Sequence, residues 1–211
     1  MTYAQNLWLF FVLLFGIIIV PGMDMLFVLS HALTGGRRAG LVATTGIMMG
    51  GSAHTLIGTL GVGFILRLTP ALLTFLLFAG AAYMAWIGAT LIRSSITVRS
   101  VSGPESRSLR VAFRQGAVTC LLNPKAYLFT LSVYPQFFNE KYGPIWSQAA
   151  AIGVMTVMTQ LGIYGGLALL AGRSRDFLLG NPRATIALGR GAGLVFMMVG
   201  ALTAWRGLLA I

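Results

Sequence analysis

The sequence predicts an all-α integral membrane protein that crosses the membrane six times. Of its 211 residues, 57% are hydrophobic and only 9% are charged, whereas a water-soluble domain of this size needs more polar surface. A helix needs about 20 apolar residues to cross a bilayer. Six segments are long enough, and they fill nearly the whole chain: 7–30, 41–66, 71–92, 111–138, 145–171 and 188–209.

Charge and cysteine content narrow the class further. The formal net charge is +11, but the basic residues stand in short clusters between apolar segments. They form no basic, aromatic-rich face of the kind that binds nucleic acid, so no nucleic-acid partner is expected. The single cysteine, Cys120, lies in an apolar run. Intramolecular disulfides and paired-thiol redox chemistry are therefore excluded, and Cys120 is expected to act as a small buried hydrophobic residue.

The first and fourth segments each contain a proline beside a charged residue, in Pro-Gly-Met-Asp at 21–24 and Asn-Pro-Lys at 123–125. A proline cannot donate to the carbonyl four residues earlier, so these two free the carbonyls of Ile17 and Cys120 and bend or interrupt their helices. Inside a membrane the freed groups need a partner, which is a neighbouring helix, a wet cavity or a bound ligand. The half-helix after each break points its positive end at the gap.

Asp24 is the only acidic residue inside a predicted segment, and Lys125 is the only basic one near a segment's middle, since Arg114, Arg190 and Arg206 lie within three residues of a segment end. A charge near the bilayer centre costs on the order of 3 kcal/mol, and such residues face a cavity, a partner or a substrate path. Asp24 is expected to carry a proton, to bind a substrate ammonium group, or to do both in turn. Lys125 holds a substrate carboxylate, reaches back to the interface, or forms a structural ion pair with Asp24.

The second and fifth segments contain polar residues whose indication of function is weaker. Gly46, Gly50 and Gly51 in the second segment are typical of helices that pack closely. His54 follows them and belongs either to a proton path or to a hydrogen bond between helices. Gln160, in the fifth segment, either lines a cavity or bonds across helices.

The third and sixth segments complete two similar three-helix units, because Ala-Trp-Ile-Gly at 85–88 matches Ala-Trp-Arg-Gly at 204–207. An odd number of spans inverts the second unit relative to the first, and corresponding broken spans in inverted repeats indicate a transporter site near the midplane. We therefore predict one transmembrane transporter domain, 1–211, made of repeat one at 1–92, a cytoplasmic linker at 93–110 and repeat two at 111–211.

The loop charges predict the orientation. Cytoplasmic loops carry an excess of Lys and Arg, which places both termini on the periplasmic side. The linker's basic residues also suit anionic lipid or a regulator, although their effect on topology is sufficient explanation. Eleven of the fifteen Lys and Arg residues then lie in inward loops: Arg37, Arg38, Arg93, Arg99, Arg107, Arg110, Arg114, Arg173, Arg175, Arg183 and Arg190. The remaining four are Arg67, Lys141 and Arg206, on the outward side, and the embedded Lys125.

Across nearly its whole length the chain resembles the LysE/RhtB amino-acid exporter family. Asn-Pro-Lys at 123–125, followed by Pro-Gln-Phe at 135–137, is the most specific part of the resemblance. The other matching motifs are 21–24, 46–50, 81–83, Phe129 and 196–200.

The resemblance implies a bacterial inner-membrane exporter of amino acids or close derivatives, driven by the proton-motive force and similar to the homoserine/threonine branch. It departs from the family at Met23, which replaces the second proline of Pro-Gly-Pro, and at Gln160, where many relatives carry an acidic residue. The residues expected to bind substrate or couple transport are Pro21, Gly22, Asp24, His54, Asn123, Pro124, Lys125 and Gln160.

The expected partners are a small amino-acid-like substrate, a proton and membrane lipid. Neither a cofactor nor a resident metal is expected, and faces of small residues allow a homodimer, although they also pack within one chain. Two other classes stay open. A divalent-metal exporter needs several carboxylates or imidazoles, and an intramembrane enzyme lacks HExxH and GxSxG motifs here.

Overall fold

The computed structural model describes residues 1–68, 70–93, 108–171 and 181–209, and within them it contains helices and no strand. Most of the predicted linker and its Arg99 and Arg107, together with Arg173 and Arg175, lie outside the described residues. The elements are α1 (Tyr3–Ile19), α2 (Met23–Leu68), α3 (Pro70–Arg93), α4 (Leu109–Leu121), α5 (Pro124–Phe137), the 3-10 turn η1 (Glu140–Tyr142), α6 (Ile145–Gln160), the π-helix η2 (Leu161–Gly165), α7 (Gly166–Leu169) and α9 (Pro182–Leu209).

Each of the six predicted segments is helical over most of its described residues. The first segment is split into α1 and the start of α2, and the fourth into α4 and α5, while α6, η2 and α7 form one continuous stretch. Glycine in the left-handed region at Gly36 (φ 75°, ψ 176°) divides α2 into two helical pieces. The all-α class is therefore confirmed.

Fewer than six of the described elements are long and apolar enough to cross a membrane. In the described part of the chain, the 25-residue stretch Ile145–Leu169 qualifies alone, with a mean hydropathy of 1.5. Helix α1 qualifies together with Met23–Gly61, across a 54° bend. Six crossings and the inverted repeats stay predictions.

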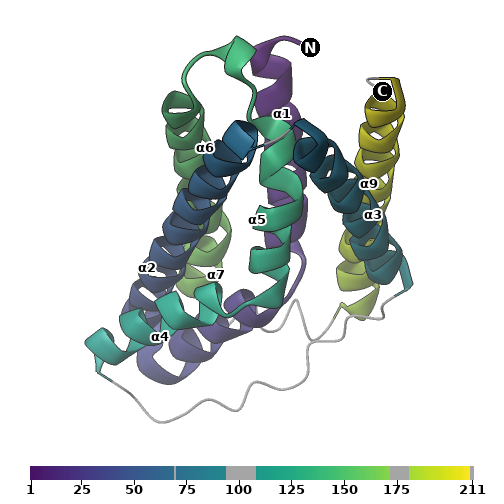
Figure 1. Ribbon diagram of the computed structural model, residues 1–211. Helices are drawn as coiled ribbons and strands as arrows, with labels where there is room; N and C mark the ends of the chain where they lie inside the picture. Colours follow the sequence, from purple (N-terminus) through teal and green to yellow (C-terminus); the bar gives the residue numbers. More distant parts are fainter. Residues whose placement is uncertain (69, 94–107, 172–180, 210–211) are drawn as a thin grey trace.

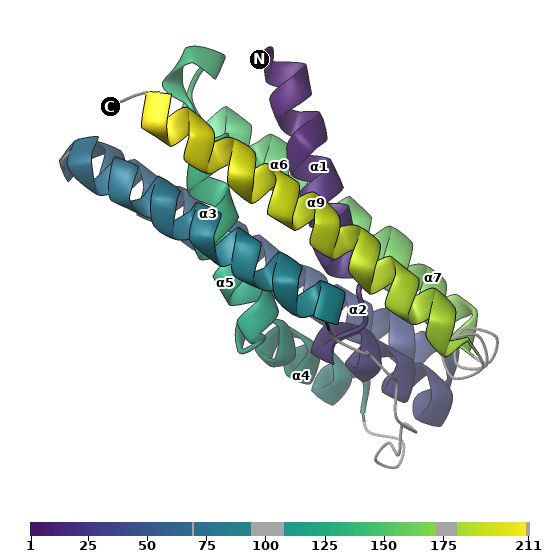
Figure 2. The same ribbon diagram turned by 90° about the vertical axis from the view of Figure 1, so that its right-hand side faces the viewer.

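Figures 1 and 2 show how the helices are arranged. Helices α1, α5 and α6 and the second piece of α2 run lengthwise side by side. Helices α3 and α9 form a pair beside them. Both termini lie at the upper end in Figure 1, where the Tyr142 hydroxyl donates to the Met1 carbonyl at 3.1 Å.

Aromatic side chains join α1, α5 and α9. The Phe10 ring lies 5.4 Å from the rings of Tyr134 and Phe137 in edge-on geometry, and Phe129 lies 6.2 Å from Phe196. Edge-to-face pairs of buried rings are favourable packing arrangements. This cluster holds α5 in the centre of the molecule.

Glycines let α2 and α4 approach closely, as predicted. A Cβ at Gly46 would collide with the Phe113 carbonyl oxygen, and one at Gly50 would lie 2.5 Å from the Cys120 Cβ. On the other side of the contact, a Cβ at Gly116 would lie 2.6 Å from the Ala43 carbonyl oxygen. The contact fixes α4, and therefore the α4–α5 break, against α2.

Large hydrophobic side chains cover much of the outer surface. Trp8, Trp86, Trp146 and Trp205 are each about 60% exposed, and exposed Leu, Ile and Met side chains accompany them on the long helices. Exposed apolar area on this scale marks a surface that meets lipid or another protein.

Candidate functional site

Both prolines interrupt their helices, as predicted. Helix α1 ends at Ile19, Val20 is its C-cap, and α2 begins at Met23. Helix α4 ends at Leu121, and α5 begins with Pro124 in its first turn. A proline suits that position because the backbone N–H it lacks has no partner inside the helix.

Each break is capped by a side chain from another part of the chain. At the first break, the Lys125 Nζ donates to the Val20 carbonyl at 2.8 Å, and the Tyr164 hydroxyl donates to the Ile18 carbonyl at 3.5 Å. At the second break, the His54 Nε2 lies 3.1 Å from the Cys120 carbonyl oxygen, which is the acceptor that Pro124 frees. The first two bonds pair carbonyls that the end of α1 leaves without helical partners. The third is an additional bond, because the Asn123 backbone N–H already donates to the Cys120 carbonyl at 3.1 Å.

The contact between His54 and the Cys120 carbonyl shows which ring nitrogen of His54 carries the hydrogen. A carbonyl oxygen only accepts, so Nε2 must carry the hydrogen. The other ring nitrogen, Nδ1, is buried and has no partner. Of the two sequence interpretations of His54, the hydrogen bond between helices is therefore present.

Lys125 and Asp24 line the same cavity without forming an ion pair. The Lys125 ammonium bonds to Val20 instead, and the Asp24 Oδ1 has no hydrogen-bond partner. Asp24 is 4% exposed and lies in the first turn of α2, where the helix dipole favours a negative charge. The ion pair expected as one alternative is thus absent between these two residues.

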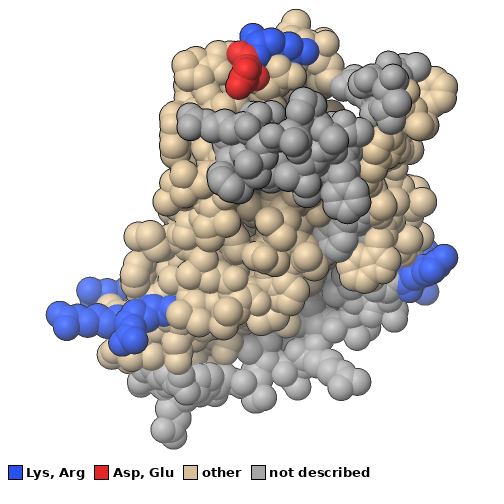
Figure 3. Space-filling view, in the orientation of Figure 1, with Lys and Arg blue, Asp and Glu red and all other residues tan. Residues whose placement is uncertain are grey.

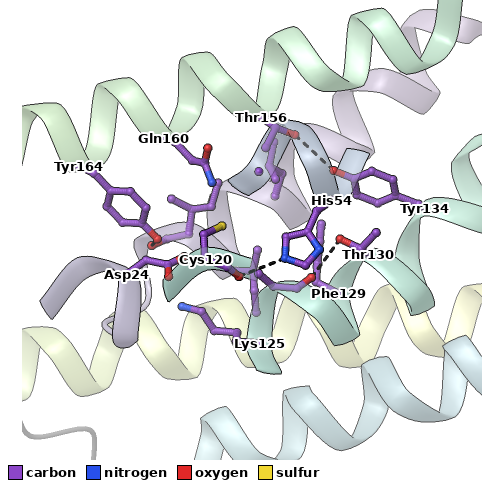
Figure 4. A pocket seen from close by; sticks show the side chains of 15 residues that line it. Asp24, His54, Cys120, Lys125, Phe129, Thr130, Tyr134, Thr156, Gln160 and Tyr164 are labelled. Carbon is purple, nitrogen blue, oxygen red and sulfur yellow. Dashed lines mark hydrogen bonds between the residues drawn. The ribbon is translucent and has the colours of Figure 1, made fainter. Parts of the chain in front are cut away.

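One cavity brings together four of the eight predicted site residues. Asp24, His54, Lys125 and Gln160 all line it, as Figure 4 shows, and its volume is about 40 Å³, which is room for a few water molecules. The remaining lining residues come from α1, α2, α4, α5, α6 and η2: Leu14, Ile17, Ile18, Gly51, Cys120, Ala126, Phe129, Thr130, Tyr134, Thr156 and Tyr164.

The other four predicted residues form the two breaks beside the cavity. Pro21 and Gly22 lie between α1 and α2, and a Cβ at Gly22 would lie 3.0 Å from the Lys125 Nζ. Asn123 is the N-cap of α5, and its Oδ1 accepts from the Lys125 backbone N–H at 3.0 Å. The breaks therefore position Lys125 rather than line the cavity.

Buried polar atoms without partners concentrate at this place. Five such atoms occur in the part of the chain that the structure describes, and four belong to predicted site residues: Asp24 Oδ1, His54 Nδ1, Asn123 Nδ2 and Gln160 Oε1. Each costs about 1–3 kcal/mol when it stays unpaired. The cluster offers both hydrogen-bond donors and acceptors to a ligand.

Three polar residues that line the cavity were not predicted from the sequence as site residues: Thr130, Tyr134 and Tyr164. Tyr134 directly precedes the Pro-Gln-Phe motif, and it enters the cavity because α5 is centrally packed. Thr156, Gln160 and Tyr164 are spaced by four residues, a spacing that puts side chains on one helix face. Tyr164 lies in the π-helix η2, a feature that is frequent at functional sites.

The described residues contain no preformed metal site. They contain no group of three or more His, Cys, Asp or Glu side chains arranged to hold a metal ion.

Known proteins similar to this chain are exporters. The homoserine/homoserine lactone efflux protein of Salmonella typhimurium is 27% identical over 184 residues, which is 87% of this chain and 88% of the relative. The leucine efflux protein of an Enterobacter species is 32% identical over 137 residues, 64% of each chain. No solved structure matches significantly. The pattern of the family described as LysE type translocator matches residues 14–207, and the chain therefore belongs to that family.

Proposed function

We propose that this protein is a secondary active exporter that moves small amino acids or amino-acid derivatives out of the bacterial cytoplasm across the inner membrane, coupled to protons. The observation that carries the proposal is the convergence of four buried, unpartnered polar atoms on the place where two helix breaks meet. The names of the relatives, homoserine/homoserine lactone efflux and leucine efflux, support amino acids as the substrate class.

The charges of the site suit a zwitterion. Asp24 Oδ1 and Gln160 Oε1 are free acceptors for an ammonium group. On the other side, the Lys125 ammonium has three hydrogens and gives one to Val20, so two remain for a carboxylate. Asn123 Nδ2, at the break before α5, is a further buried donor without a partner.

Coupling to protons rests on Asp24 in this proposal. An embedded carboxylate that alternates between a proton and a substrate ammonium group cannot hold both at once, and this exclusivity is the basis of exchange. The cavity volume of about 40 Å³ is smaller than an amino acid, so binding requires the lining helices to move apart. Alternating access between an inward-open and an outward-open form provides that movement.

The two charged residues occupy equivalent places, which supports six spans in two inverted repeats. Asp24 is the second residue of α2, after the first break, and Lys125 is the second residue of α5, after the second break. The helices that follow in each proposed repeat, α3 and α9, pair through glycines, since a Cβ at Gly88 would lie 2.6 Å from the Gly193 carbonyl oxygen. The boundaries at 1–92, 93–110 and 111–211 belong to this proposal.

The distribution of basic side chains supports termini on the periplasmic side. In Figure 3, Lys and Arg form groups on both sides of the lower half, whereas the upper end, which holds both termini in Figure 1, shows one basic group beside an acidic one. Arg110 and Arg114 are exposed near the start of α4, and Arg93 is in the last turn of α3, both at the lower end. This is the asymmetry that the positive-inside rule associates with the cytoplasm.

The decisive experiment is efflux from bacterial cells loaded with single amino acids through dipeptide feeding, with and without a protonophore. The intact protein is compared with Asp24→Asn and with Glu140→Gln, which neutralises an exposed carboxylate outside the cavity. We expect gradient-dependent export of one or a few amino acids, kept in Glu140→Gln and lost in Asp24→Asn at equal membrane abundance.

Two results would contradict the proposal. Export of no amino acid or derivative by correctly inserted protein would remove the substrate class. Undiminished, protonophore-sensitive export by Asp24→Asn would keep the class and remove Asp24 from coupling.

A further inference from the structure

Helix α4 has one buried face and one exposed face, and the exposed face has no part in the proposed transport cycle. The buried side chains recur every fourth residue, at Ala112, Gly116 and Cys120, on the side where α4 packs against α2. Residues shifted by two positions point to the opposite side, because two residues turn a helix by about 200°. The outer stripe of α4 consists of four such residues, all exposed: Arg110, Arg114, Val118 and Leu122.

The outer stripe changes from cationic to apolar along its length. Arg110 and Arg114 form its first half, at the lower end of the molecule in Figure 1, and Val118 and Leu122 form its second half, next to the break before α5. Val118 is 52% exposed and Leu122 is 71% exposed. From Arg110 to Leu122 the helix rises by about 18 Å. In the proposed orientation, the first half therefore lies at the level of lipid headgroups and the second half meets hydrocarbon.

A hollow of about 280 Å³ lies against the middle of the outer stripe. The described residues that line it all come from α4: Val111, Arg114, Gln115 and Val118. A guanidinium group presents paired N–H donors that match phosphate oxygens, and a side-chain amide adds two more donors. The two valines give the hollow an apolar part. This combination suits a phosphate ester that carries an apolar body.

The two arginines have no carboxylate partner in the described part of the chain. That part contains two acidic residues, of which Asp24 lines the central cavity and Glu140 belongs to η1. Arg110 also lies in the first turn of α4, where the helix dipole disfavours positive charge. The positive-inside rule requires only that such charges be cytoplasmic. It does not explain why they share one stripe with a hollow and with exposed apolar side chains.

We propose that the outer stripe of α4 binds an anionic phospholipid of the cytoplasmic leaflet. The phosphate lies between Arg110 and Arg114, Gln115 donates to its oxygens, and an acyl chain runs along Val118 and Leu122. Negative charge on the lipid complements the two arginines, and its apolar chain covers the exposed second half of the stripe. The inference goes beyond the proposed function and takes only the orientation from it.

A lipid at this place also bears on the helix break. Helix α2 holds α4 by its buried face, and the lipid holds it by the outer stripe. Helix α4 ends at Leu121, and Asn123, which caps α5, follows two residues later. Binding of the lipid therefore stabilises the fold around the break that positions Lys125, and the unfolding midpoint reports it.

The test measures lipid binding by the purified full-length protein in detergent, without any transported amino acid. The protein is titrated with phosphatidylglycerol, with phosphatidylcholine that has the same acyl chains, and with inorganic phosphate, and the unfolding midpoint is followed. We expect phosphatidylglycerol to raise the midpoint in a saturable way and phosphatidylcholine to raise it much less. Inorganic phosphate should have little effect, because it lacks the chain that contacts Val118 and Leu122.

Variants then assign the binding to residues. Each basic side chain near an anionic lipid surface contributes roughly fivefold to affinity. Arg110→Gln and Arg114→Gln should each weaken phosphatidylglycerol binding by about that factor, and the double variant by roughly thirtyfold. The matched control combines Arg183→Gln with Arg190→Gln, which removes the same charge from exposed positions of α9 and should leave the affinity nearly unchanged.

The outcomes separate a lipid site from the other possible occupants. Equal stabilisation by phosphatidylcholine, or equal loss of affinity in the α9 double variant, overturns the inference. Full stabilisation by inorganic phosphate assigns the site to a free anion instead. A dimer that the α4 double variant disperses, with no effect of lipid, assigns the stripe to a second copy of the chain. Each of these results leaves the exporter in place, whereas failure to export any amino acid overturns the proposed function and leaves the lipid titration unaffected.

Discussion

The ammonium group of Lys125 donates a 2.8 Å hydrogen bond to the carbonyl oxygen of Val20, 105 residues earlier in the chain. The bond places a cation at the C-terminal end of α1, where unpaired carbonyls favour positive charge. It also ties the two helix breaks to each other. A substrate carboxylate that binds Lys125 competes with the Val20 carbonyl for the ammonium group. In the proposed mechanism, substrate binding therefore weakens the bond that joins the two helix breaks.

Replacing Lys125 with methionine should remove recognition of the substrate carboxylate. A charge-assisted hydrogen bond contributes about 1.5–3 kcal/mol, so we expect the KM for export to rise roughly ten- to a hundredfold. The measurement compares the amino acid exported best with its amide, which lacks the carboxylate charge. The intact protein should prefer the acid, and Lys125→Met should lose that preference.

Lys141→Met serves as the control, because Lys141 is exposed, belongs to η1 and does not line the cavity. An unchanged preference for the acid in Lys125→Met would show that another group binds the carboxylate.

Alanine at Gly46 should destabilise the protein, whereas alanine at Gly61 should not. The added methyl group at Gly46 meets the backbone oxygen of Phe113, which cannot move aside, while nothing lies within 4 Å of the corresponding position at Gly61. Overpacking typically costs about 1–3 kcal/mol, and Gly→Ala at an open helical position gains roughly 0.5–1 kcal/mol. Unfolding midpoints in detergent measure both. Equal midpoints would contradict the close contact of α2 with α4.

Alanine at Gly51 should impair export more than folding. The added methyl group would lie 2.6 Å from the Gln160 Oε1 and 2.7 Å from its Nε2. These are the end atoms of a flexible side chain, which can swing into the cavity and reduce the space for substrate. We expect export to fall severalfold while the unfolding midpoint moves less than in Gly46→Ala. A variant that loses both together would indicate a purely structural glycine.

Much of the architecture was predictable because proline and apolar length act locally. A proline removes one backbone donor wherever it stands, so the interruptions at Pro21 and Pro124 follow from the sequence alone. The close approach at Gly46 and Gly50 follows from side-chain size in the same way. The six apolar segments correspond to helices for the same local reason.

The partners of the charged groups were not predictable, since they depend on how the helices are packed. Nothing in the sequence shows that Lys125 reaches the Val20 carbonyl rather than Asp24, or that His54 bonds to the carbonyl freed by Pro124. Tyr134 and Tyr164 resemble ordinary apolar-segment tyrosines until α1, α5 and α6 are brought together. Long-range packing therefore decides which polar residues share the cavity.

His54 should be replaceable by a residue that keeps a donor at the position of Nε2. His54→Phe removes one of the bonds to the Cys120 carbonyl, which keeps the Asn123 N–H as a partner, and should cost about 0.5–1.5 kcal/mol of stability, whereas His54→Gln should retain most of it. Ser52→Ala is the control on the same helix, because Ser52 is exposed and bonds only within the helix, to Met48 at 3.0 Å. We also expect His54→Gln to keep protonophore-sensitive export, because Asp24 carries the proton in the proposal. Loss of coupling without loss of stability would instead assign His54 to the proton path.

Cys120 should report the opening of the cavity. It is the only cysteine in the chain, its side chain is fully buried, and it lines the cavity beside Asp24 and Gln160. A small, positively charged methanethiosulfonate reagent reaches it only when the lining helices separate. We expect slow labelling in membrane vesicles, and slower labelling still when the best-exported amino acid occupies the cavity.

In a Cys120→Ala background, Val118→Cys provides the comparison, because Val118 is on the same helix and 52% exposed. That position should label independently of the amino acid. Equal protection at the two positions, or none at Cys120, would place the substrate elsewhere and separate the cavity from the transport path.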